Sequence, residues 1–184
     1  MHNSYLSSAL KQFQYYKFLG DKTFNQLFDQ ELFWQSDTES NSIAIIVKHM
    51  VGNMLSRWTD FLTEDGEKSW RDRDNEFVDT YQNRADILTS WEKGWTCVFS
   101  ALNQIDNNNL ETIVYIRNQG HTITEAINRQ LCHYSYHVGQ IVLIGRMLKK
   151  EAWISLSVPK NQSKKYNQEK FSKEKGNRHF TEDL

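Results

Sequence analysis

The chain has 184 residues, enough for one compact domain and too few for a second hydrophobic core. Hydrophobic residues make up 39% of the chain and aromatic residues 13%, which excludes an intrinsically disordered protein. Because 22 Lys and Arg residues nearly balance 23 Asp and Glu residues, the formal net charge is −1, and we expect neither nucleic acid nor a membrane as a partner.

Helical periodicity dominates the first part of the chain. The single proline, Pro159, lies far from this part, so nothing there interrupts long helices. Apolar residues recur every three or four positions from Ser4 to about Phe33, which predicts a first helix. Ser42 can cap a second helix that continues to about Phe61. The charged residues 65–83 that follow predict a long loop or a short helical turn.

The second part of the chain adds two helices with an extended segment between them. A third helix is predicted from about Arg84 to Ile105. The period then changes over residues 111–123, where Ile113, Tyr115 and Arg117 alternate with Val114 and Ile116. An Asn-Gln-Gly turn signal follows and the extended pattern resumes, which predicts a small β-hairpin. Thr122 and Glu125 have the spacing of a capping box and can start a fourth helix that runs to about Lys150.

These elements predict an all-α fold, a four-helix bundle with a small β-hairpin before the fourth helix. We assign residues 1–159 to the helical bundle domain. Residues 160–184 hold seven Lys or Arg and four Asp or Glu, and we expect a polar, flexible tail. This Lys-rich tail is the one feature that would favour nucleic-acid binding, and the nearly neutral remainder argues against it.

The cysteines and the hydropathy pattern indicate a cytoplasmic protein. Cys97 and Cys132 are too few for a secreted disulfide framework, so we expect free thiols. The first residues lack the pattern of a signal peptide, and no apolar run approaches the roughly 18–20 residues needed to cross a bilayer. We interpret Cys132 as a small packing residue rather than a nucleophile or a metal ligand.

The sharpest chemical pattern is the pair His133 and His137 in the fourth helix. Residues four apart in a helix point the same way, which suits a shared metal ion. The apolar residues of the same stripe predict that both side chains face the bundle interior. Burial of two unpartnered imidazoles costs a few kcal/mol, and a metal removes that cost. The alternative is a pair of core or surface histidines bonded to backbone or water.

A third ligand has to come from elsewhere in the chain. His49 is the best candidate, because it lies at the edge of the apolar face of the second helix. The alternative is a core histidine with satisfied hydrogen bonds, which is the more frequent case for a single histidine at such a position. His121 in the hairpin competes for the role, whereas His2 and His179 lie in termini that we expect to be mobile.

These histidines, one in the second helix and a pair in the fourth after a hairpin, resemble the DinB/YfiT-like superfamily of metal-binding four-helix bundles over roughly residues 1–150. Longer strings resemble an uncharacterised branch of that superfamily. They are GNMLSRWTDFLTEDGEKSWRDRDNEF at residues 52–77, QLCHYSYHVGQI at 130–141 and WISLSVPK at 153–160. The resemblance implies that His49, His133 and His137 are the metal ligands.

The resemblance also implies an activity. Similar proteins include S-transferases that use bacillithiol, mycothiol or glutathione, a hydrolase- or isomerase-like minority, and many members without a known reaction; homodimers are common. We therefore expect one divalent metal ion and metal-dependent transfer of a low-molecular-weight thiol to an electrophilic small molecule. Zn or Ni is favoured, and three imidazoles also suit Fe, Co or Mn. The alternative is a non-catalytic metal-binding or dimeric interaction protein.

Two sets of polar residues are candidates for supporting roles around the ion. Asn53 and Gln140 lie within a turn of the predicted ligands and could orient a ligand or a bound water, unless they are ordinary surface amides. Arg57, Arg71 and Arg73 could bind a thiol cofactor that carries carboxylates. The alternative is that these arginines form salt bridges with nearby carboxylates: Asp65, Asp72, Asp74 and Glu76.

Overall fold

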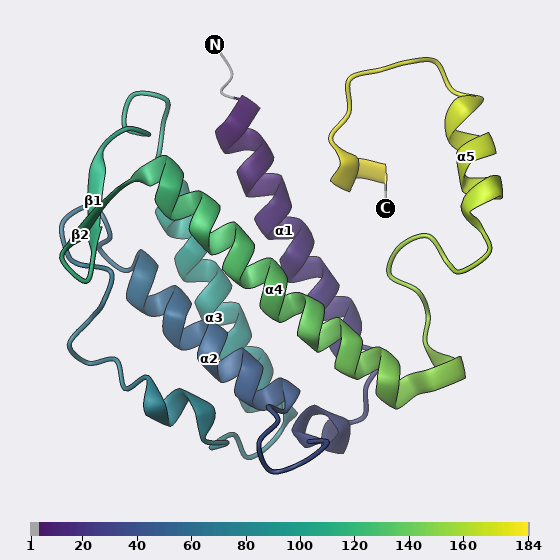
Figure 1. The fold of residues 1–184 in the computed structure, drawn as a ribbon, viewed down its shortest axis with the longest axis horizontal. Helices are drawn as coiled ribbons and strands as arrows, with labels where there is room; N and C mark the ends of the chain where they lie inside the picture. Colours follow the sequence, from purple (N-terminus) through teal and green to yellow (C-terminus); the bar gives the residue numbers. More distant parts are fainter. Residues whose placement is uncertain (1–3, 184) are drawn as a thin grey trace.

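This computed structural model describes residues 4–183. They contain five α-helices and one two-stranded β-hairpin, joined by loops and short 3-10 turns (Figure 1). The helices are α1 (Ser4–Phe24), α2 (Ile43–Trp58), α3 (Arg84–Leu102), α4 (Ile123–Lys149) and α5 (Ser163–Phe171). The hairpin consists of β1 (Ile113–Ile116) and β2 (Gln119–Thr122). The predicted all-α fold with a hairpin before the long helix is confirmed.

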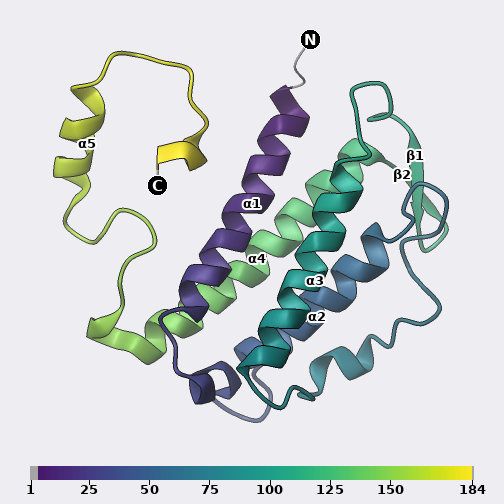
Figure 2. The same ribbon diagram turned by 180° about the vertical axis from the view of Figure 1, so that it is seen from behind.

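Helices α1 to α4 form a ring in which each helix packs against two others: α1 on α4, α4 on α2, α2 on α3, and α3 on α1 (Figures 1 and 2). Sequential neighbours α2 and α3 run in the same direction (Figure 1). A parallel pair cannot be joined by a tight turn, so residues 59–83 travel back along the bundle. This return path carries the charged residues 65–77 alongside α2.

One aromatic ring from each of the four helices meets in the core. Phe13 of α1 lies 6.4 Å from Trp58 of α2, 6.3 Å from Trp95 of α3 and 5.9 Å from Tyr134 of α4, measured between ring centroids. The Tyr134 hydroxyl accepts a hydrogen bond from Trp58 Nε1 (3.0 Å) and donates one to Asn53 Oδ1 (3.1 Å). These bonds fix α4 against α2 at the residue next to His133.

The predicted helix starts are confirmed by their caps. The Ser42 side chain accepts a hydrogen bond from the backbone N–H of Ile45 at the start of α2. Thr122 and Glu125 form the reciprocal capping box that starts α4. In the hairpin, Ile113 pairs with Thr122, and the two turn residues have positive φ angles, as tight two-residue hairpins require.

The first helix is shorter than predicted, because α1 ends at Phe24 and not near Phe33. The Arg84 guanidinium, at the start of α3, donates hydrogen bonds to the carbonyl oxygens of Phe24 and Leu27 and satisfies the end of the helix. Residues Asp29–Phe33 form a separate 3-10 turn that buries Leu32. The helical spacing of apolar residues therefore continues beyond Phe24, although the α-helix ends there.

The C-terminal segment contains α5 and a final 3-10 turn, Phe180–Asp183. Its end returns to α1, where His179 Nε2 lies 3.0 Å from Ser8 Oγ and Lys11 pairs with Glu182. The expected flexibility of this tail stays a prediction, and His2 lies outside the described residues. Within residues 4–183, no helix combines the length and the apolar composition that a bilayer crossing requires.

Candidate metal centre

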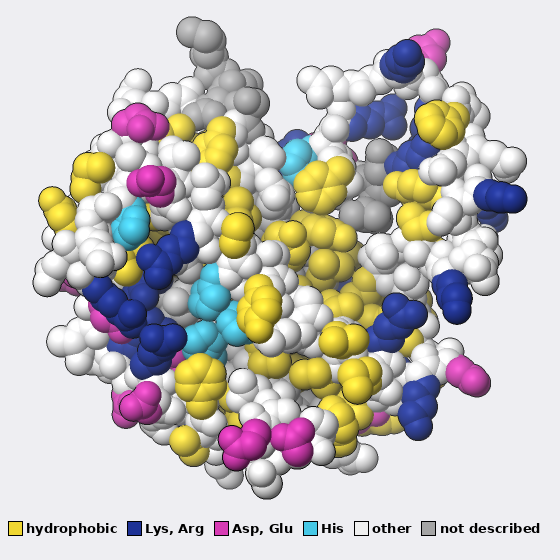
Figure 3. Space-filling model, viewed as in Figure 1, with side chains coloured by type: hydrophobic (Ala, Val, Ile, Leu, Met, Phe, Trp, Pro, Cys, Tyr) yellow, Lys and Arg dark blue, Asp and Glu magenta, His cyan; other side chains and the backbone are white. Residues whose placement is uncertain are grey.

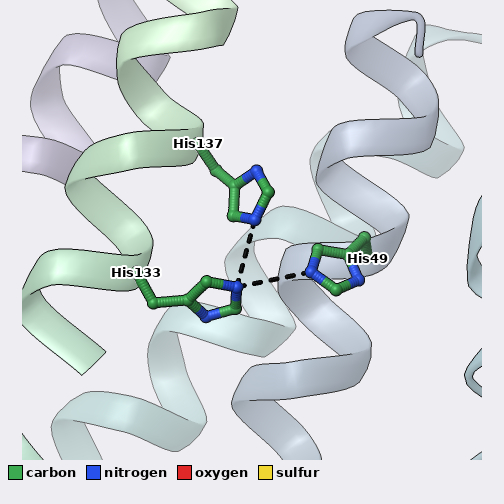
Figure 4. A group of neighbouring side chains, drawn as sticks. All are labelled: His49, His133 and His137. Atoms are coloured by element: carbon green, nitrogen blue, oxygen red, sulfur yellow. Dashed lines mark hydrogen bonds between the residues drawn. The ribbon is translucent and has the colours of Figure 1, made fainter. Parts of the chain in front are cut away.

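Three histidine side chains from two helices converge on one point (Figure 4). His133 and His137 project from successive turns of α4, and His49 faces them from α2. His133 Nε2 lies 3.0 Å from His137 Nε2 and 3.4 Å from His49 Nε2. Ligand atoms of all three lie within 4.8 Å of one another, so the group is close enough to hold a metal ion.

A buried carboxylate orients His49. Its Nδ1 lies 2.9 Å from Glu76 Oε2 and donates its hydrogen to that oxygen, which leaves the Nε2 lone pair directed at the other two histidines. Arg71 holds the carboxylate in place through two hydrogen bonds, from Nε (2.7 Å) and Nη2 (3.0 Å). Burial alone would raise the pKa of Glu76, but the bonds from His49 and Arg71 hold that pKa below its usual value.

Gly52 provides the space for this carboxylate. A Cβ at Gly52 would lie 2.7 Å from Cδ of Glu76, closer than real Cβ contacts. Glycine in a helix interior costs about 0.5–1 kcal/mol relative to alanine. The approach of Glu76 is a physical reason to keep glycine at this position of α2.

An amide orients His137. Its Nδ1 lies 2.8 Å from Gln140 Oε1 and donates to it, so the Nε2 lone pair of His137 also faces the centre. His133 Nε2 can donate one hydrogen and cannot satisfy both acceptors. A cation satisfies all three nitrogens. For a tetrahedral ion with metal–nitrogen distances of about 2.0–2.1 Å, the nitrogens would lie about 3.3 Å apart. The two distances from His133 Nε2, 3.0 Å and 3.4 Å, are near this value.

The two imidazoles of α4 are suited to be neutral ligands. Burial, followed by the neighbouring His137 and His49, lowers the pKa of His133 from 6.5 to about 3. Burial also lowers the pKa of His137, against the hydrogen bond to Gln140. Neutral imidazole is the form that binds metal, so the lowered pKa values of His133 and His137 favour metal binding over protonation at these two ligands.

The centre lies at the surface groove between α2 and α4, which corrects the expectation that His133 and His137 face the bundle interior. His49 is buried, but His133 and His137 are only half-buried. Figure 3 shows a group of histidine side chains on this face beside a group of Lys and Arg side chains. The ring of Phe77 stacks on His49 at 4.9 Å and covers it from one side. The site is therefore open to small molecules.

A pocket of about 180 Å³ adjoins the histidines. Two of the three histidines form part of its wall, and arginines form most of the rest. The pocket is lined by His49, Asn53, Arg57, Arg71, Arg73, Arg117, Arg129, Gln130 and His133.

The predicted supporting residues have different positions. Gln140 contacts His137 directly, whereas Asn53 accepts from Tyr134 and reaches the pocket wall without a hydrogen bond to a histidine. Arg71 forms the alternative salt bridge with Glu76. Arg57 donates to the Gly66 carbonyl oxygen and pairs with Glu67. These contacts leave Gln140 beside the centre and tie Arg57 and Arg71 into the wall.

The remaining candidates lie apart from the centre or differ from expectation. Arg73 lines the pocket, and its side chain has no hydrogen bond or ion pair within the described residues. His121 lies on β2 and does not belong to the histidine group. Both cysteines are free, as predicted, but Cys132 is exposed and is therefore not a packing residue.

The orienting role of Glu76 and the space provided by Gly52 were not predicted from the sequence. Glu76 lies in an aperiodic, charged segment, where nothing in the spacing separates it from its acidic neighbours. A signal for Gly52 existed, because this glycine interrupts an apolar helix at the i+3 position from His49. The pocket arginines Arg117 and Arg129 were also missed, since they come from the hairpin turn and from α4.

Comparison with known proteins gives a family and no activity. The sequence model of the family described as "Protein of unknown function (DUF1572)" matches residues 1–162. No curated protein and no solved structure matches the chain. The match covers all four bundle helices and all three histidines, and it ends before α5.

Proposed function

The chain belongs to the DUF1572 family, and we propose that it binds one divalent metal ion through His49, His133 and His137 and uses that ion in thiol transfer to an electrophilic small molecule. The observation that supports metal binding is the convergence of three Nε2 atoms, two of them oriented from behind by Glu76 and Gln140. Structural histidines rarely need such orientation, whereas metal ligands commonly have it.

The donor set supports a site for reaction rather than a closed structural site. Three protein ligands are typical of catalytic sites, which keep an open position, and structural zinc sites usually have four. Three neutral imidazoles leave the ion its full charge, and an ion so held lowers the pKa of a thiol or a water that it binds, which supplies a nucleophile at neutral pH.

The residues of the chain hold and shape this site. Arg71 fixes Glu76, Glu76 fixes His49, and Gln140 fixes His137, so two of the three imidazoles are positioned before a ligand arrives. The pocket beside His49 and His133 gives a small molecule room next to the open side.

The choice of a thiol as nucleophile rests on the resemblance to DinB/YfiT-like proteins. In the proposed reaction the thiol loses its proton to solvent and its sulfur forms a bond to an electrophilic carbon. A leaving group departs with the electron pair of the bond that breaks. The thiol is a low-molecular-weight co-substrate, because neither Cys97 nor Cys132 belongs to the histidine group.

A direct assay tests the proposal. Zinc- and nickel-loaded protein would be incubated with bacillithiol, mycothiol or glutathione and 1-chloro-2,4-dinitrobenzene, and thioether formation followed by absorbance. We expect turnover with at least one thiol, loss of it in His133→Ala and retention in His121→Ala. Metal-loaded protein without turnover for all three thiols would contradict thiol transfer and favour a non-catalytic metal-binding protein.

A further inference from the structure

The pocket beside the metal centre is strongly positive. Five arginines line it, and they come from α2, from the segment before Asp74, from the hairpin turn and from α4. Among the described residues, only two carboxylates form ion pairs with these arginines, namely Glu67 and Glu76. The lining therefore has an excess of three positive charges before any metal binds. The whole chain has a net charge of −1, so this excess is local.

The arginines fall into two groups. Arg57 and Arg71 form the floor: their side chains are 6% and 2% exposed, and both bind carboxylates. Burial, and the nearby Arg71 and Arg129 charges, lower the pKa of Arg57 in spite of its bond to Glu67. Crowding of like charges in this way is costly without a counter-ion.

The second group is exposed and incompletely neutralised. Arg73 and Arg129 line the pocket and are exposed, and their guanidinium groups have no hydrogen bond or ion pair within residues 4–183. Arg117 is also exposed and makes a 3.3 Å ion pair with Glu67, a carboxylate that it shares with Arg57 and Arg71. Guanidinium groups in this state are suited to paired hydrogen bonds with an oxyanion.

The pocket wall also has unused hydrogen-bonding capacity. Arg57 Nε, a donor, and Gln130 Oε1, an acceptor, are buried and have no hydrogen-bond partner in the part of the chain that the structure describes. Gln130 is 2% exposed, and an unpaired polar atom so deep in a protein is unfavourable. A polar ligand or an ordered water in the adjoining space would relieve this cost.

From these observations we propose that the arginine-lined pocket is an oxyanion subsite, which holds a carboxylate or phosphate group of a small molecule beside the metal centre. Arg73 and Arg129 make the contacts with the oxyanion, and Arg57 and Arg71 supply the positive floor. The inference rests on the proposed function in one respect, namely that the bound molecule is the electrophile or the thiol of that reaction. The substrate that binds here therefore carries an anionic group.

The size and shape of the pocket limit the ligand. At about 180 Å³ it is smaller than the roughly 300–1,000 Å³ of pockets for drug-sized ligands. It can hold one anionic group with a few neighbouring atoms and not a large cofactor. The positive charge is gathered in a concavity rather than along a stripe, so a small anion fits it and a polyanion such as nucleic acid does not.

Calorimetric titration tests the proposal with two probes, inorganic phosphate and malonate, which distinguish a phosphate from a carboxylate ligand. Each is titrated into metal-free and nickel-loaded full-length protein at about 0.15 M ionic strength. The test variant is Arg73→Gln/Arg129→Gln. The control is Arg146→Gln, which removes an exposed arginine from the same helix α4 outside the pocket.

We expect saturable 1:1 binding of at least one probe to both protein forms. The double variant should weaken it about tenfold or more, and the control should leave it unchanged. Absence of binding, or equal binding to wild type and double variant, would overturn the subsite. Anion binding by a protein that takes up no metal would support the subsite and refute the proposed function. Metal uptake without anion binding would refute the subsite and leave the proposed metal binding in place.

Discussion

His49 and Glu76 lie 2.9 Å apart, from Nδ1 to Oε2, although 27 positions separate them in the chain. The contact exists because α2 and α3 run parallel, so that the segment joining them returns beside α2 (Figure 1). A connection often regarded as a loop thereby supplies the carboxylate that orients a candidate metal ligand. The arginine Arg71 in the same segment holds that carboxylate.

The first prediction concerns this carboxylate. In Glu76→Gln, His49 loses a charged acceptor and its orientation, so we expect metal affinity to fall by about 10–100-fold. Competition with a fluorescent zinc chelator measures this. The matched control is Glu92→Gln, whose carboxylate is exposed and pairs with Lys17. Equal affinities of the two variants would show that Glu76 does not orient His49.

The second prediction concerns the space at Gly52. Gly52→Ala gains about 0.5–1 kcal/mol of helix propensity but displaces Glu76, and overpacking costs about 1–3 kcal/mol. We expect lower stability in urea and weaker metal binding. Gly139→Ala in α4 is the control, because a Cβ there meets nothing within 4 Å. The Gly139→Ala variant should be more stable than wild type. If Gly52→Ala were also more stable, Glu76 would be free to move away, and the space at Gly52 would not be required.

The third prediction concerns the core beneath the histidines. Tyr134→Phe leaves Trp58 Nε1 and Asn53 Oδ1 without their buried partner, which costs about 1–3 kcal/mol of unfolding free energy. Tyr136→Phe, an exposed change in the same helix, should alter stability by less than about 0.5 kcal/mol. Urea unfolding of both variants measures the difference. Similar values for the two would contradict the role of Tyr134 as a link between α2 and α4.

The fourth prediction concerns pH. In the metal-free fold the pKa of His133 is lowered from 6.5 to about 3, so the unfolded chain takes up this proton at a higher pH than the folded chain. The free energy of unfolding should therefore fall as the pH drops below 6.5 toward 3. Denaturant unfolding at several pH values in this window measures the slope. We expect a shallower slope in His133→Gln, and an unchanged slope would contradict the lowered pKa.

Local signals in the sequence predicted most of the fold. Ser42, and Thr122 with Glu125, mark helix starts through bonds within three residues, and the turn before β2 is equally local. The predicted end of α1 was wrong, because Arg84, 60 residues after Phe24 in the chain, binds the carbonyl oxygen at the end of that helix. Contacts between residues so far apart leave no trace in periodicity.

The candidate site was predictable only in part, for the same reason. The spacing of His133 and His137 is a property of one helix. The position of His49 in the second helix made it the best candidate for a third ligand, and the resemblance favoured it over His121. Glu76 acts through the return path of the chain, and a one-dimensional pattern does not show which carboxylate will lie behind a given imidazole. The half-buried position of His133 and His137 at a groove depends on how far apart α2 and α4 pack.

The central claim is that three histidines hold one metal ion, and the metal content of purified, untagged protein tests it most directly. Mass spectrometry would compare wild type with His49→Ala, His133→Ala, His137→Ala and the control His121→Ala. We predict about one equivalent of divalent metal in wild type and His121→Ala, and strong loss in the other three. A wild-type protein that carries no metal and takes up neither added zinc nor nickel would contradict the claim.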